Sequence, residues 1–158
     1  MMLSFFKWMG DLAFSKALGA SVWQFAFIQA LHLVALAVFA GAILIVDLRL
    51  MGRALTERPV SQVAREAQPW MIWGFLALVV TGVPQMMQNA MREYYSELFW
   101  IKMVFLAVAL VYTFTLRRQV TLADRTDRVN LQTKMVGLGS IVLWAGVAIP
   151  ARLIGLFS

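Results

Sequence analysis

The sequence has no cysteine, a single histidine and few charged residues. Without cysteine the chain has neither disulfide bonds nor thiolate metal sites, and cysteine usage gives no information on its redox compartment. Charged residues make up 14% of the 158 residues and hydrophobic residues 61%, with a mean hydropathy of +0.76. This composition is typical of an integral membrane protein. The net charge of +6 comes without an exposed basic domain, so we expect no nucleic-acid partner.

The apolar residues are gathered into four long blocks, at residues 22–46, 69–85, 98–116 and 135–157. A helix needs about 20 apolar residues to cross a hydrocarbon core of about 30 Å. The sequence therefore predicts an all-α fold, an integral membrane four-helix bundle that forms one transmembrane domain over residues 1–158. The expected spans are about 22–48, 69–89, 98–117 and 135–157. The first block begins too far from the N-terminus for a removable signal peptide, so we expect it to remain in the mature chain.

Two further segments are amphipathic without spanning the membrane. In segment 3–18, apolar residues recur at helical spacing opposite polar ones: Phe5, Phe6, Met9, Leu12 and Ala13 against Lys7, Asp11 and Ser15. We expect this N-terminal helix to lie in the headgroup plane. In segment 56–70, Pro59 suits the start of a helix and Pro69 suits the start of the second span.

The basic residues predict the orientation of the chain. With four spans, the connections 48–68 and 117–134 share one side of the membrane. They carry nine of the fourteen Lys and Arg residues: Arg49, Arg53, Arg58, Arg65, Arg117, Arg118, Arg125, Arg128 and Lys134. That side is cytoplasmic by the positive-inside tendency, so we expect both termini to face outward. The basic residues also favour contact with anionic lipid headgroups.

The only histidine, His32, lies inside the apolar run 29–41, QALHLVALAVFAG. At 1.5 Å per residue it lies about 15 Å below Val22, near the middle of the bilayer. Polar residues at this depth are costly and are functional candidates by default. Each span carries one weakly polar face, and with these faces turned inward the outer half of the bundle collects His32, Thr81, Gln85, Lys102 and Arg152. Trp144 lies on the same face of the fourth span as Arg152.

Several roles are open for these residues. His32 is a neutral histidine hydrogen-bonded to Gln or Thr of a neighbouring helix, a ligand of haem iron or another metal, or part of a proton relay. Snorkelling to the headgroups also explains Lys102 and Arg152. The thioethers near the outer end suit Cu(I), although methionine more often serves as flexible apolar filler. These methionines are Met86, Met87, Met91 and Met103.

Asp47 and Arg49 mark the inner end of the first span. Residues two apart on a helix do not face each other. We therefore expect each of them to pair with another helix at the inner boundary, in a structural role, and Arg49 also with lipid phosphate.

Three runs carry a resemblance to known proteins: LHLVALAVFAGAILIVDLRLMG, WGFLALVVTG and FWIKMVFLAVALVYTFTLRR. Over residues 25–118 the chain resembles a superfamily of small bacterial inner-membrane helix bundles. The superfamily includes a haem-binding, flavin-independent membrane protoporphyrinogen oxidase, the copper-resistance D-type proteins and an uncharacterised four-helix family. The matching features are His32 with Gly41 after it, the Leu48-Arg49-Leu50 run, and Trp100-Ile101-Lys102 at the start of the third span.

The resemblance implies a bacterial inner-membrane location and ties His32 and Lys102 to haem binding and activity. The oxidase has a proline before its arginine where this chain has Asp47-Leu48, and aromatic and histidine residues where this chain has Met51-Gly52. The uncharacterised family, with its acidic-Leu-Arg-Leu run, is therefore the more similar group.

Two functions follow as predictions. The first is a b-haem protein in electron transfer or tetrapyrrole redox chemistry, with His32 as the metal ligand. In it Lys102 and Arg152 lie toward the propionates, and the remaining cofactor-binding residues are Thr81, Gln85 and Trp144. The second is a cofactor-free binding or structural membrane protein, in copper or small-molecule handling, whose polar cluster only joins helices. Ala37 and Gly41, four residues apart, offer a close-packing surface for a homo-oligomer or for the internal bundle. The sequence identifies no redox partner.

Overall fold

The structure is a computed structural model that describes residues 2–13, 15–16, 22–122 and 129–156. Helices make up nearly all of this part of the chain, and it contains no strand. Their bounds are α1 Met2–Asp11, α3 Val22–Leu50, α4 Val60–Gln88, α5 Ala90–Tyr94, α6 Glu97–Tyr112, the π-helix η1 Thr113–Arg117, α7 Arg118–Leu122 and α8 Leu131–Leu156. The predicted all-α fold is confirmed.

Four helical segments are long and apolar enough to cross a membrane. They are Trp23–Leu50, Val60–Gln88, Glu97–Leu122 and Leu131–Ile154. Large apolar side chains point out of the bundle along all four, as Trp23 at 87% exposed and Val80 at 71% exposed show. A water-soluble monomer does not expose so much contiguous apolar surface, so we infer that these faces contact lipid. The predicted number of four long apolar helices is confirmed.

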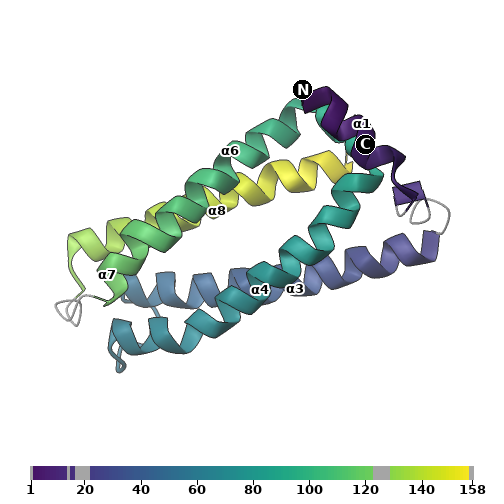
Figure 1. Ribbon diagram of the computed structural model, residues 1–158. Helices are drawn as coiled ribbons and strands as arrows, with labels where there is room; N and C mark the ends of the chain where they lie inside the picture. The colour runs from purple at the N-terminus through teal and green to yellow at the C-terminus, as the bar shows by residue number, and fades with distance from the viewer. Residues whose placement is uncertain (1, 14, 17–21, 123–128, 157–158) are drawn as a thin grey trace.

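The four long segments form two helix pairs (Figure 1). One pair is α3 with α4, and the other is α6 with α8. The pairs meet where α3 packs on α8 and α4 packs on α7, near the connection 51–59. We call this the loop end, and the opposite end, which holds α1 and α5, the α1 end.

The main apolar core lies at the loop end. Its members are Phe39, Ala42, Ile43, Val46, Leu50, Val60, Val63, Ala67 and Met71. Two glycines let helices approach closely here, as small residues do in membrane bundles. A Cβ at Gly74 would lie 3.0 Å from the Cβ of Phe39, and a Cβ at Gly137 would lie 2.9 Å from the carbonyl oxygen of Asp47.

Span boundaries differ from the sequence prediction, most clearly at the start of the second span and at the end of the third. The second span begins at Val60, and Pro69 lies inside α4 instead of starting it. Burial of Val60, Val63 and Ala67 holds the first turns of α4 in the core, although proline removes one backbone donor from the helix. The third helical segment continues through η1 to Leu122, so Arg117 belongs to the helix and not to the connection.

The helix α1, Met2–Asp11, covers the first part of the predicted N-terminal amphipathic segment 3–18, and its faces differ in part from the prediction. Phe6 and Met9 are buried against Ala90 and Phe99. Ser15, expected on the polar face, is buried and donates a hydrogen bond to the carbonyl of Met87 at 3.0 Å. Phe5 at 52% exposed and Trp8 at 59% exposed point outward, so only part of the predicted apolar face packs against the bundle. These differences arise because α1 covers the end of the bundle as well as presenting a face to its surroundings.

Candidate functional site

His32 is joined to the second span by a hydrogen bond. Its Nδ1 lies 2.8 Å from Oγ1 of Thr81 on α4. Thr81 Oγ1 also lies 2.6 Å from the carbonyl oxygen of Ala77, to which only a hydroxyl proton can be donated. A hydroxyl carries a single proton, so Nδ1 of His32 must be the donor in the other bond. Nδ1 therefore carries a proton, and in the neutral imidazole the lone pair is then on Nε2.

The helices around His32 leave room for its ring. Gly82 lies against it, since a Cβ there would be 3.2 Å from Cε1 of His32. Lys102 from α6 is within electrostatic range of the imidazole. Its amino group lies 5.0 Å from the centroid of the Phe99 ring. The histidine therefore contacts α4 directly and is influenced by a charge from α6.

The other predicted site residues have separate environments. Gln85 donates to the backbone carbonyl of Thr81 at 3.1 Å, so its amide is engaged one turn from the histidine contact. Arg152 is exposed, and within the described residues no hydrogen bond or ion pair holds it. Trp144 donates to Thr113 Oγ1 at 3.2 Å and packs edge-on against Phe39 at 4.9 Å. The structure thus brings Thr81 to His32 directly, but it uses Trp144 at the loop end.

The described residues contain no group of three or more His, Asp or Glu side chains that could hold a metal ion. His32 alone offers a nitrogen with an unshared pair, which is the donor a haem iron takes from a protein as one axial ligand. Among the methionines considered for copper, Met86 and Met87 pack against the Phe6 and Phe99 cluster.

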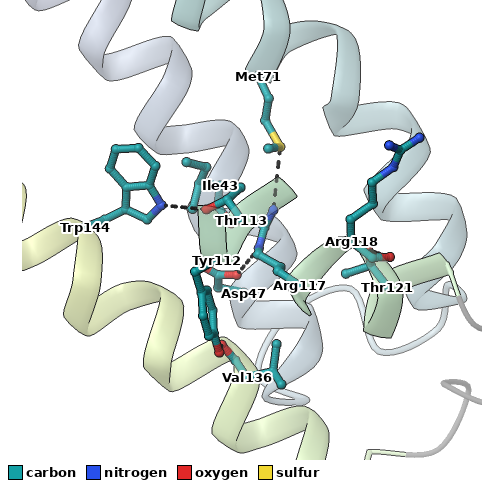
Figure 2. A network of polar contacts seen from close by, with 10 residues as sticks. All are labelled: Ile43, Asp47, Met71, Tyr112, Thr113, Arg117, Arg118, Thr121, Val136 and Trp144. Carbon is teal, nitrogen blue, oxygen red and sulfur yellow. Dashed lines mark hydrogen bonds and ion pairs between the residues drawn. The ribbon is translucent and has the colours of Figure 1, made fainter. Parts of the chain in front are cut away.

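A second polar network is buried at the loop end (Figure 2). Nε of Arg117 donates to Oδ1 of Asp47 at 2.7 Å, and Nη2 donates to the carbonyl of Ile43 at 2.9 Å. Nη1 lies 3.7 Å from Sδ of Met71. The side chains of the ion pair are 4% and 0% exposed. Ser140 lies near the same carboxylate. Its hydroxyl and Oδ2 of Asp47 are buried and have no hydrogen-bond partner among the described residues.

The π-helix η1 accounts for how Arg117 reaches this network. A π segment widens one helical turn and rotates the residues that follow it. Thr113, at the start of η1, accepts the Trp144 hydrogen bond, and Arg117 at its end enters the core. Tyr112 adds a bond from its hydroxyl to the carbonyl of Val136 at 3.0 Å. The network therefore ties the first, second and fourth spans to the third span.

The prediction that Asp47 pairs with another helix is confirmed, and the same prediction for Arg49 is wrong. Asp47 pairs with another helix, as predicted, whereas Nε of Arg49 donates to the carbonyl of Arg58 in the α3–α4 connection at 2.7 Å. Arg117 was missed as a buried partner because it was assigned to a connection. The available signal was its place directly after the apolar block 98–116, at the same inner boundary as Asp47.

The charge of Lys102 acts on a residue at the α1 end as well as on His32. Glu93 lies on α5, outside the spans, where burial raises the pKa of its carboxyl above the ordinary value. The charges of Lys102 and Arg92 act in the opposite direction with smaller effect. Lys102 therefore lies in electrostatic range of both Glu93 and His32.

The four apolar helices and their buried polar networks define a multi-pass helical membrane protein. The chain belongs to a family of unknown function, DUF6644, whose model matches residues 5–158. No curated protein and no solved structure matches the chain. The resemblance to haem-binding oxidases and copper-resistance proteins therefore stays a prediction from the sequence runs that suggested it.

Proposed function

We propose that the protein binds b-type haem in the bacterial inner membrane, with Nε2 of His32 as an axial ligand of the iron. The observation that carries the proposal is the Nδ1–H bond from His32 to Thr81. In the neutral ring this bond leaves Nε2, inside the first apolar helix, with an unshared electron pair. Metal-bound histidines usually donate their other ring N–H to an acceptor that fixes tautomer and orientation. Haem would supply a centre for one-electron exchange, in electron transfer or tetrapyrrole redox chemistry.

The chain's own residues have defined tasks in this proposal. Thr81 orients the imidazole and keeps the proton on Nδ1, while Gly82 leaves space for the ring. Lys102 offers a positive charge in electrostatic range of His32, which suits the carboxylates of a haem. Arg152 is exposed on α8, the helix that packs on α6. We assign it the haem carboxylates as partners too.

A cofactor-free structural or binding role is the second candidate. The observation that favours it is that the His32–Thr81 bond by itself joins α3 to α4. Interhelical hydrogen bonds of this kind stabilise membrane bundles without any ligand. Under this role the polar cluster only joins helices.

Purification from haem-replete cells separates the two candidates. We expect a Soret band in the wild-type protein and in Gln29→Ala, a control on the same helix three residues before His32, and its loss in His32→Ala. The fold of each variant is checked by circular dichroism. Protein that purifies colourless and takes up no added haem supports the structural role and overturns the haem proposal.

We also propose that both termini are periplasmic and that the protein can form homo-oligomers. Ala37 and Gly41 line an open groove of about 390 Å³ between α3 and α4, with Trp70 on its opposite side. A Cβ at Gly41 would meet nothing within 4 Å, so in a single chain this small-residue surface faces outward. The surface is accessible to lipid or to a helix of a second copy.

A further inference from the structure

An open cavity of about 410 Å³, with polar and apolar lining, lies at the α1 end between α1 and the junction of α4 with α5. Its polar lining comes from Lys7 and Asp11 on α1 and from Gln88, Asn89 and Arg92 on the other side. The cavity is remote from the Asp47 network, which is at the loop end, and His32 does not line it. Its lining carries charges of both signs.

Several of the lining groups are without an internal partner. Oε1 of Gln88 is buried and accepts no hydrogen bond from the described residues. Lys7 is exposed, and in the described parts of the chain it forms no hydrogen bond or ion pair. Asp11 pairs with Lys16 at 3.3 Å, but both side chains are exposed. An exposed pair of this kind contributes little and exchanges readily for another partner.

The chemistry of these groups points to a ligand with two different ends. Lys7 and Arg92 suit a phosphate, since ammonium and guanidinium groups donate to its oxygens. The exposed Asp11 carboxylate accepts hydrogen bonds, and a primary ammonium group provides three N–H bonds for it. A quaternary ammonium has no N–H, and a headgroup ending in hydroxyls has no positive charge.

We propose that this cavity binds a phosphate ester that carries a primary ammonium group, the chemistry of the phosphoethanolamine headgroup. The ester can be a membrane lipid or a soluble molecule. Phe5 and Trp8 project from the outer face of α1, and exposed aromatic side chains of amphipathic helices lie at the headgroup level of membranes. The cavity is therefore at the depth where a lipid headgroup would enter it.

The test is native mass spectrometry of the purified full-length protein with an equimolar mixture of three phospholipids that share their acyl chains. Their headgroups are phosphoethanolamine, phosphocholine and phosphoglycerol. We expect the phosphoethanolamine lipid to be retained most, because only it offers both a phosphate and N–H donors with positive charge. Added soluble phosphoethanolamine distinguishes the sources: displacement of the lipid supports a soluble ester, and retention of the lipid supports the membrane source.

Matched variants connect this preference to the cavity. Arg92→Gln, at an exposed position, should reduce retention of the phosphoethanolamine lipid by about three- to tenfold. Asp11→Asn, which removes the exposed carboxylate, should bring the retention of the phosphoethanolamine and phosphocholine lipids closer together. Lys134→Gln, which removes an exposed charge from α8, is the control and should change neither. Equal retention of the three lipids, or a preference that survives both cavity variants, overturns the proposal whether or not the protein binds haem.

Discussion

Arg117 and Asp47 form an ion pair of 2.7 Å between two helices, and neither side chain is more than 4% exposed. Seventy residues separate them in the chain. Two charges removed from water are costly, and their attraction offsets this cost only when the remaining hydrogen-bonding groups are also satisfied. The bond from Arg117 to the Ile43 carbonyl satisfies part of the guanidinium.

Breaking this pair should destabilise the bundle strongly. Arg117→Met leaves the Asp47 carboxylate buried without its cation, and we expect a loss of about 3–5 kcal/mol in the free energy of unfolding. The double variant Arg117→Met with Asp47→Leu removes both charges and should recover much of that loss. Thermal unfolding in detergent, followed by circular dichroism, measures the effect. A double variant less stable than the single one would contradict the interpretation.

Thr81 should control how firmly the histidine holds its ligand. Thr81→Val keeps the shape of the side chain but removes the acceptor of the Nδ1–H bond, while Thr81→Ser keeps the acceptor. Loss of such a supporting contact typically weakens metal binding by about 10- to 100-fold. We expect faster haem transfer from Thr81→Val to a scavenging protein, and wild-type behaviour from Thr81→Ser. Equal transfer rates for both variants would exclude this orienting role.

Lys102 should affect haem retention more than the absorption spectrum. Its charge is in electrostatic range of His32, but the imidazole is the proposed ligand. Lys102→Met should therefore release haem faster with little change in the position of the Soret band. Lys102→Arg preserves the charge and serves as the control. A large spectral shift in Lys102→Met would instead indicate that Lys102 coordinates the iron.

Glu93 should make stability depend on pH. Because burial raises the pKa of its carboxyl in the folded state, its ionisation opposes folding. The stability contribution is then greatest below the unfolded-state pKa and is lost as the pH rises through the folded-state pKa. We therefore expect the stability of Glu93→Gln relative to the wild type to increase as the pH is raised from about 4 to about 7. Melting temperatures of both proteins at the two pH values test this, and a constant difference would contradict it.

Reporter fusions test the orientation. With both termini outside, a C-terminal reporter that fluoresces only in the cytoplasm should stay dark, and a periplasmic phosphatase at the same position should be active. The basic bias toward the loop end persists although Arg117 is buried, because Arg53, Arg65 and Arg118 remain exposed there. A bright fluorescent fusion would reverse the proposed topology.

The sequence by itself determined the four long apolar helices and the place of His32 within the first of them. These features are local: a long apolar run must form a helix in lipid, where every backbone N–H and C=O has to be satisfied within the segment. It did not determine the boundary at Pro69, because burial of Val60 and Val63 against the core continues the helix beyond the apolar block.

Only the tertiary structure decided which polar groups meet. His32 and Thr81 are 49 residues apart, and their contact depends on how α3 and α4 are rotated about their axes. The pairing of Asp47 with Arg117 depends further on the π-helix, which no apolar period in the sequence reveals. Apolar faces look alike to lipid and to neighbouring helices, so hydropathy sets the length of a span, whereas side-chain packing sets its rotation and its polar partners.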